Sequence, residues 1–121
     1  MVENDRTDWD AVYRRFCGTK QPAIRLAAAV DGFFGGQEVC EEARAEYGRC
    51  IRSRIRPAVE LLIEQNEPGR ILELERLGWF GERELDEFIR RAGERGRETV
   101  LLVLLRLKEE RYGYRDRDYS L

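Results

Sequence analysis

Residues 77–107 read LGWFGERELDEFIRRAGERGRETVLLVLLRL, and this stretch decides the fold. In its first half, apolar side chains recur at positions i, i+3, i+4 and i+7, which is the period of one helix face. They are Leu85, Phe88, Ile89 and Ala92. Glycines then bracket a turn at residues 93–96, and a leucine-rich run follows from Val100. The stretch therefore predicts a helix, a tight turn and a second helix.

The run Val100–Leu105 has two interpretations when taken alone. Six consecutive apolar residues are typical of a buried strand as well as of a buried helix. The charged continuation Lys108–Arg111 and the helical neighbours favour the helix.

The same pattern occurs once before, at an offset of about 30 residues. The matching apolar positions are Val59 and Ile89, Ile71 and Leu101, Leu74 and Leu104, and Leu77 and Leu107. A lone helix pair cannot bury both of its apolar faces, so we expect the two pairs to stack on one another.

A leucine–glycine loop, an amphipathic helix, a glycine turn and a leucine-rich helix thus follow one another. The residues are Leu77-Gly78, then Leu85-Asp86-x-x-Ile89-x-x-Ala92, Gly96, and Val100-x-x-Val103-Leu104-Leu105. This order resembles an ankyrin repeat, and is most similar to the degenerate ankyrin-like repeats of uncharacterised bacterial proteins. The resemblance covers about residues 45–114. It implies an α-solenoid fragment of stacked helix pairs that binds a partner protein.

The first pair departs from this pattern. Glu67-Pro68 stands where the second pair has its glycine turn, and the threonine–proline–leucine–histidine signature of full ankyrin repeats is missing.

The N-terminal half predicts three further helices. They cover residues 9–16 with Thr7 as the N-cap, residues 23–34 after Pro22, and residues 37–55. Pro57 then allows a kink or a tight corner, and we favour the corner. We therefore expect one all-α domain of six to seven helices without a sheet. Its parts are N-terminal helices (1–56), two ankyrin-like pairs (57–114) and a loose tail (115–121).

The composition of the chain argues against several classes of protein. Charged residues make up 38% of the 121-residue chain, yet the net charge is −2, unlike the basic charge of most polyanion-binding proteins. No apolar run approaches the ~20 residues that span a bilayer, and the acidic N-terminus does not read as a signal peptide. Three cysteines without zinc-site spacing indicate reduced thiols. We expect a cytoplasmic protein that does not insert into membranes.

The sequence offers little for catalysis. It contains no histidine, which excludes catalytic triads, histidine-bearing metal sites and an imidazole general base. Phosphate-binding glycine motifs are also missing. We expect no enzymatic activity, no cofactor and no metal.

Three groups of residues are candidate contacts for a partner. The first is a stripe of Arg49, Arg52 and Arg56, spaced i, i+3 and i+7 on one predicted helix. Such a stripe could bind phosphates or an acidic partner. The alternative is internal pairing with glutamates such as Glu60 and Glu64, and we favour it.

The second group is Trp79 and Phe80 in the loop between the pairs. They are either an exposed aromatic anchor or an inward-packing plug, which is the commoner arrangement. The third is Leu101 and Leu102 on an unusually apolar last helix. A terminal repeat needs a polar cap, so the N-terminal helices, a second copy or a partner must cover it.

The leading hypothesis is a non-catalytic protein–protein interaction module, with a homodimer through the last helix as one form. The alternatives are nucleic-acid binding through the arginine stripe, and a small inhibitor from a mobile element that blocks a host or defence enzyme.

Overall fold

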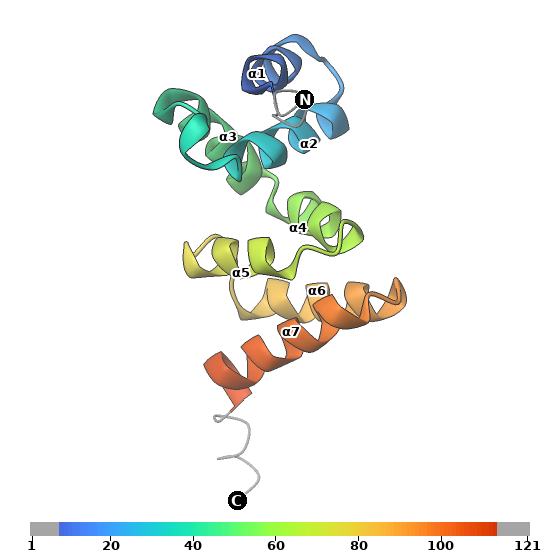
Figure 1. The fold of residues 1–121 in the computed structure, drawn as a ribbon. Helices are drawn as coiled ribbons and strands as arrows, with labels where there is room; N and C mark the ends of the chain where they lie inside the picture. Colours follow the sequence, from blue (N-terminus) through green and yellow to red (C-terminus); the bar gives the residue numbers. More distant parts are fainter. Residues whose placement is uncertain (1–7, 114–121) are drawn as a thin grey trace, which may run out of the picture. The chain divides into compact units, whose positions relative to one another are not determined.

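The computed structural model describes residues 8–113, and within them the chain forms seven α-helices and no strand (Figure 1). The predicted all-α class is confirmed. The chain divides into two compact units between Arg54 and Ile55, two residues before the predicted boundary at 56/57. A single domain stays a prediction, and the tail at 115–121 lies outside the described residues. No described helix is long and apolar enough to cross a membrane.

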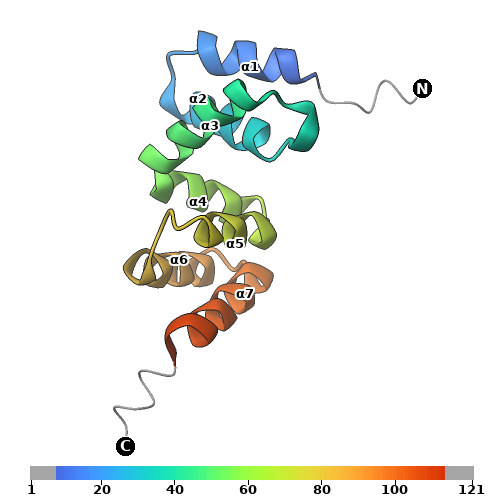
Figure 2. The ribbon, with the colours of Figure 1, turned by 90° about the vertical axis from the view of Figure 1, so that its left-hand side faces the viewer.

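The first unit contains α1 (Trp9–Gly18), α2 (Pro22–Phe33), a short 3-10 helix η2 (Gly36–Glu38) and α3 (Glu41–Ser53). Helix α2 packs against both α1 and α3 (Figure 2). It is apolar nearly all round, which suits this central place, and Pro22 at its start needs no hydrogen-bond acceptor for a backbone N–H.

Aromatic rings form the centre of the first unit. The rings of Phe16 and Tyr47 meet edge to face, with centroids 5.0 Å apart, and both side chains are almost fully buried. The Tyr47 ring lies directly on the backbone of α2 at Gly32, where a Cβ atom would come within 2.1 Å of it. The close contact between α2 and α3 therefore requires glycine at position 32.

The predicted start of the first helix at residue 9 is confirmed, but its predicted N-cap and the predicted start of the third helix are wrong. Asp8, not Thr7, is the N-cap of α1, because its carboxylate accepts a hydrogen bond from Ala11 N–H at 3.1 Å; Thr7 lies outside the described residues. Helix α3 begins at Glu41 rather than at position 37. Its N-cap is Cys40, whose Sγ accepts from Ala43 N–H.

The predicted corner near Pro57 is present, but it lies three residues earlier. Helix α3 ends at Ser53, and Arg54 leaves the helical conformation with φ −132° and ψ 52°. Helix α4 (Ile55–Glu64) begins directly afterwards. Pro57 falls in its first turn, where a missing backbone N–H costs nothing.

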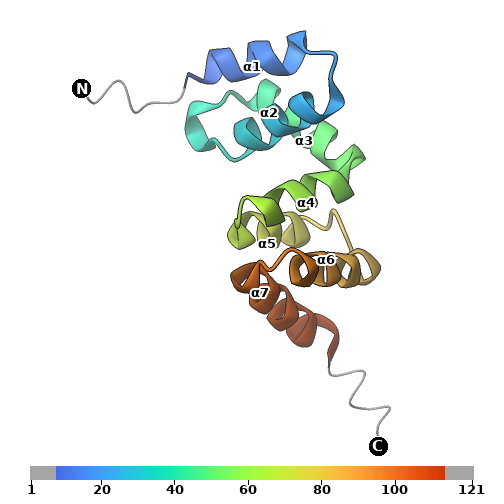
Figure 3. The same ribbon diagram turned by 90° about the vertical axis from the view of Figure 1, so that its right-hand side faces the viewer.

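The second unit contains α4, α5 (Pro68–Arg76), α6 (Glu82–Glu94), α7 (Glu98–Lys108) and a short π-helix η3 (Glu109–Gly113). Within each consecutive pair the helices pack together, α4 on α5 and α6 on α7 (Figure 3). Helix α4 also contacts α6, and α5 contacts α7. The run Val100–Leu105 is part of α7, so the strand interpretation is wrong. The α-solenoid classification stays a prediction.

Three helices of this unit end in the same way. At the ends of α4, α5 and α6, one residue takes the left-handed conformation: Asn66 (φ 59°), Gly78 (φ 80°) and Gly96 (φ 69°). In each case the backbone N–H of this residue and the N–H of the following residue donate to carbonyl oxygens of the preceding helix, which is the Schellman motif. The bonds are Asn66–Ile63, Glu67–Leu62, Gly78–Glu75, Trp79–Leu74, Gly96–Gly93 and Arg97–Ala92. Asn66 thus replaces the glycine that the first pair lacked, as asparagine tolerates this conformation.

Candidate interaction surfaces

The predicted arginine stripe is divided between two helices. Arg49 and Arg52 lie on α3, whereas Arg56 lies on α4. The i, i+3, i+7 spacing places side chains on one face only when the helix is continuous, and α3 ends at Ser53. The prediction that the three arginines line one helix face is therefore wrong.

Arg56 is internally paired. Its Nε lies 3.0 Å from Glu87 Oε1 and its Nη2 lies 3.6 Å from Glu84 Oε2 on α6. The pKa of Glu84 is lowered, first by the hydrogen bond from Gly81 N–H, next by its own N–H, and also by the charge of Arg56. The favoured alternative of internal pairing therefore holds for Arg56, with other partners than the predicted Glu60 and Glu64, whereas Arg49 and Arg52 make no ion pair with a described acidic residue.

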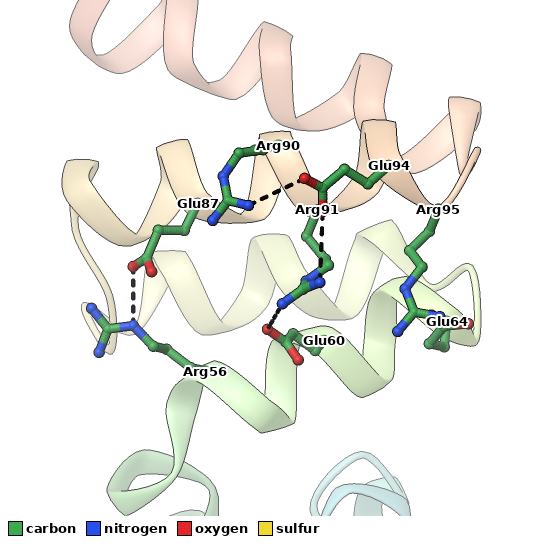
Figure 4. Close-up of polar contacts among 8 residues, drawn as sticks. All are labelled: Arg56, Glu60, Glu64, Glu87, Arg90, Arg91, Glu94 and Arg95. Carbon is green, nitrogen blue, oxygen red and sulfur yellow. Dashed lines mark hydrogen bonds and ion pairs between the residues drawn. The ribbon is translucent and has the colours of Figure 1, made fainter.

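The predicted partners Glu60 and Glu64 instead bind an arginine of α6 and the arginine that caps its C-terminus (Figure 4). Glu60 lies 3.4 Å from Arg91, and Glu64 lies 2.9 Å from Arg95. Together with Arg56–Glu87 these contacts form three successive rungs between α4 and α6, which we call the ion-pair ladder. Each rung joins residues 31 positions apart.

Phe80 is a buried plug. Only 7% of it is exposed, and its ring meets Phe88 of α6 edge to face at 5.1 Å. Trp79 is half-buried beside it. The inward-packing alternative therefore holds for Phe80, and an exposed anchor formed by both aromatic rings does not exist in this conformation.

Among the described residues of the second unit, the most exposed large apolar side chains lie on helix α7. Its buried stripe is Val100, Leu104 and Leu107. The opposite side presents Leu102, which is 67% exposed, and Leu105, which is 45% exposed. Leu101 is half-buried. Of the two predicted contacts Leu102 is accessible, and Leu105 is a further one that the uniformly apolar run did not distinguish.

Charged residues flank these two leucines. Glu98 lies one turn before Leu102 and is exposed. Arg106 lies one turn after it and contacts Glu110 at 3.4 Å. We call Glu98, Leu102, Leu105 and Arg106 the α7 face. It combines a small apolar centre with one negative and one positive end.

The first unit contains a groove that sequence reasoning missed. It has a volume of about 850 Å³ and lies where the α1–α2 connection meets the second half of α3. Four cationic side chains line it: Lys20, Arg25, Arg49 and Arg54. They come from separate segments, so no local sequence pattern could have revealed the cluster. We call it the cationic groove.

Glu46 is the acidic residue in the wall of the cationic groove. The hydroxyl of Tyr13 donates to its carboxylate, at 3.1 Å from each oxygen. Hydrogen bonds to Cys17 and to Glu46 raise the pKa of Tyr13 to about 12. Because folding favours the neutral phenol, this contribution to stability is complete below pH 10 and is lost as the pH rises through about 12.

The titration of Tyr13 is directly measurable. In an absorbance titration of the tyrosines, Tyr13→Phe is expected to remove one tyrosine's amplitude from the step near pH 12. The matched variant is Glu46→Gln, which keeps every tyrosine but removes the carboxylate that accepts from the Tyr13 hydroxyl, so it should move this step to lower pH. A step that Tyr13→Phe leaves unchanged would contradict the Tyr13–Glu46 contact.

Within residues 8–113, no group of three or more histidine, cysteine or carboxylate side chains is placed to hold a metal ion. No family model, no curated protein and no solved structure matches this chain. The ankyrin-like resemblance thus rests on the residues quoted for it alone.

Proposed function

We propose that this protein is a non-catalytic protein–protein interaction module that binds a partner helix through the α7 face. The observation that carries the proposal is the exposure of Leu102 and Leu105 on neighbouring positions of one helix side. Exposed leucines on a helix suit a partner helix, which buries them in its own apolar stripe. The absence of histidine from the chain supports a role without catalysis.

The charged ends of the α7 face favour an antiparallel partner helix with opposite charges. A second copy of this chain supplies such a helix. With a two-fold axis at Leu102, each Glu98 lies opposite the Arg106 of the other copy, because both residues are four positions from residue 102. Such a self-complementary contact is the usual form of a homodimer interface. We take a second copy as the occupant that this surface fits best.

The test compares the wild type with Leu102→Glu and with the matched variant Leu77→Glu. Leu77 is also an exposed leucine of the second unit, at 40% exposure, but lies outside the α7 face. Glutamate is a good helix former, so Leu102→Glu should keep the fold, as circular dichroism would verify. Analytical ultracentrifugation is expected to show a dimer for the wild type and for Leu77→Glu, and a monomer for Leu102→Glu.

A monomeric wild type would rule out the second copy. Affinity capture with the same three baits then decides the general proposal. Proteins retained by the wild type and by Leu77→Glu, but lost from Leu102→Glu, would support a different partner on the same face. Identical capture by all three monomeric baits would overturn the assignment of the α7 face.

A further inference from the structure

We propose that the cationic groove binds an oligophosphate group, such as the phosphate chain of a nucleotide. This site lies in the first unit, and it is independent of the protein contact proposed for α7. The proposal rests on four features of the groove: unpaired cations, a guanidinium held in place, a helix start without a side-chain cap, and the size of the groove.

The cations of the groove have no carboxylate partners among residues 8–113. None of Lys20, Arg25, Arg49 and Arg54 makes an ion pair with a described acidic residue. The second unit behaves differently, because every described arginine there except Arg83 pairs with a carboxylate. These arginines are Arg56, Arg70, Arg76, Arg90, Arg91, Arg95, Arg97, Arg106 and Arg111. Four unpaired cations around one groove therefore leave their charge available to a ligand.

Arg25 is already held in position. Its Nη1 donates to the carbonyl oxygen of Phe16 at 3.3 Å, and its guanidinium carbon lies 4.2 Å from the centroid of the Phe16 ring. Phe16 is buried, so this support is rigid. A guanidinium has five N–H donors, which leaves several for a ligand, and a side chain ordered in advance loses less entropy on binding.

The first turn of α2 adds to the positive potential. Pro22, its first residue, lines the groove. The N-cap residue Gln21 makes no side-chain hydrogen bond to the helix, so no side-chain cap neutralises the exposed N–H groups of this turn. A helix start of this kind favours anions, and phosphates in particular.

One acidic residue opposes this potential without cancelling it. Glu46 accepts hydrogen bonds from Tyr13. The described residues that line the groove include Glu46 and four cations, an excess of three positive charges. At the end of α3, Ser53 Oγ donates to the carbonyl oxygen of Cys50 at 2.9 Å. This bond occupies one of the carbonyl groups that would otherwise repel an anion.

The size of the groove and the confinement of positive charge to it define the class of ligand. A groove of about 850 Å³ lies within the range of small-molecule sites, about 300–1,000 Å³. It is larger than one phosphate needs. The whole chain carries a net charge of −2, whereas proteins that track a nucleic-acid backbone present extended basic surfaces. A short chain of phosphates therefore fits better than a long nucleic acid.

The experiment measures binding of inorganic triphosphate to the full chain by isothermal titration calorimetry at low ionic strength. The test variant is Arg49→Glu/Arg54→Glu. The matched control is Arg14→Glu/Arg15→Glu, which makes the same charge change at two exposed arginines of the first unit outside the groove. Loss of two charge-assisted hydrogen bonds is expected to weaken binding by roughly 100-fold in the test variant, and by far less in the control.

Four results would overturn the proposal: no binding to the wild type, equal weakening in both double variants, equally tight binding of phosphate-free polyglutamate, or tighter binding of a single-stranded oligonucleotide. The last two would assign the groove to an acidic peptide or to nucleic acid. Adenosine triphosphate distinguishes the sources of an oligophosphate. If adenosine triphosphate binds more tightly than inorganic triphosphate, the ligand of the groove is a nucleotide. If the two bind equally, the ligand is inorganic polyphosphate.

Discussion

Gly32→Ala is expected to destabilise the first unit by about 3 kcal/mol, at the upper end of the usual cost of overpacking a core. The new Cβ would lie 2.1 Å from Cε2 of Tyr47. The ring cannot move away easily, because it is 1% exposed and is held by Phe16 at 5.0 Å and by Tyr13 at 6.2 Å between centroids. Either α2 and α3 separate or the aromatic cluster rearranges. The helix propensity that alanine gains, about 1 kcal/mol, does not offset this strain.

Gly18→Ala is the matched control for this prediction. Gly18 is also a helical glycine of the first unit, but a Cβ atom there would meet nothing within 4 Å. Its effect should stay within about 1 kcal/mol. Urea denaturation measures both free energies of unfolding, and hydrogen exchange should show faster opening of the α2 and α3 peptides in Gly32→Ala. Equal urea midpoints for the two variants would refute the close approach at Gly32.

Leu104→Ala is expected to destabilise the second unit by about 3 kcal/mol, within the usual range for a buried leucine. Leu104 lies in the middle of α7 and is 0% exposed. Its removal leaves a cavity among the helices that α7 contacts, α5 and α6. Since those helices are held by their own buried residues, they can fill the space only in part.

Leu102→Ala makes the same chemical change two positions earlier on the same helix. Because Leu102 is 67% exposed in the single chain, we expect Leu102→Ala to change the free energy of unfolding of the monomer by no more than about 0.5 kcal/mol, measured at a protein concentration at which any dimer of the wild type is dissociated. The difference between the two variants in urea denaturation measures which side of α7 is buried. Similar losses in both would mean that α7 is rotated relative to the described arrangement.

The helical architecture could be predicted from the period of the apolar residues. The break between α3 and α4 could not be placed as well, because the apolar stripe continues in phase from Ile51 through Ala58 to Leu62. Periodicity reports which side of a helix is buried, and it does not report whether the backbone bends between two turns. The prediction of an arginine stripe was wrong for the same reason, because it treated Arg52 and Arg56 as parts of one helix.

The candidate surfaces differ in how much the sequence reveals. Leu102 could be predicted, because α7 is apolar on nearly every side. The cationic groove could not, because Lys20, Arg25 and Arg54 belong to three separate segments. Their approach depends on how α1 and α3 pack on α2. Such long-range proximity leaves no local signal in a single sequence.

The ion-pair ladder has a consequence for the uniqueness of the fold. Two apolar helix faces can slide past each other by one turn and still bury similar surface. The order of charges between α4 and α6 penalises both slips. In one direction Arg56 would meet Arg91 and only Glu60 would keep a cation, Arg95. In the other, Glu60 would meet Glu87 and only Glu64 would keep a cation, Arg91. Each slip thus replaces three attractive contacts by one, together with a contact between like charges. Exposed ion pairs add little stability, but like charges brought together select against the wrong partner. The ion-pair ladder thus favours one alignment of α4 along α6 over the alignments shifted by one turn.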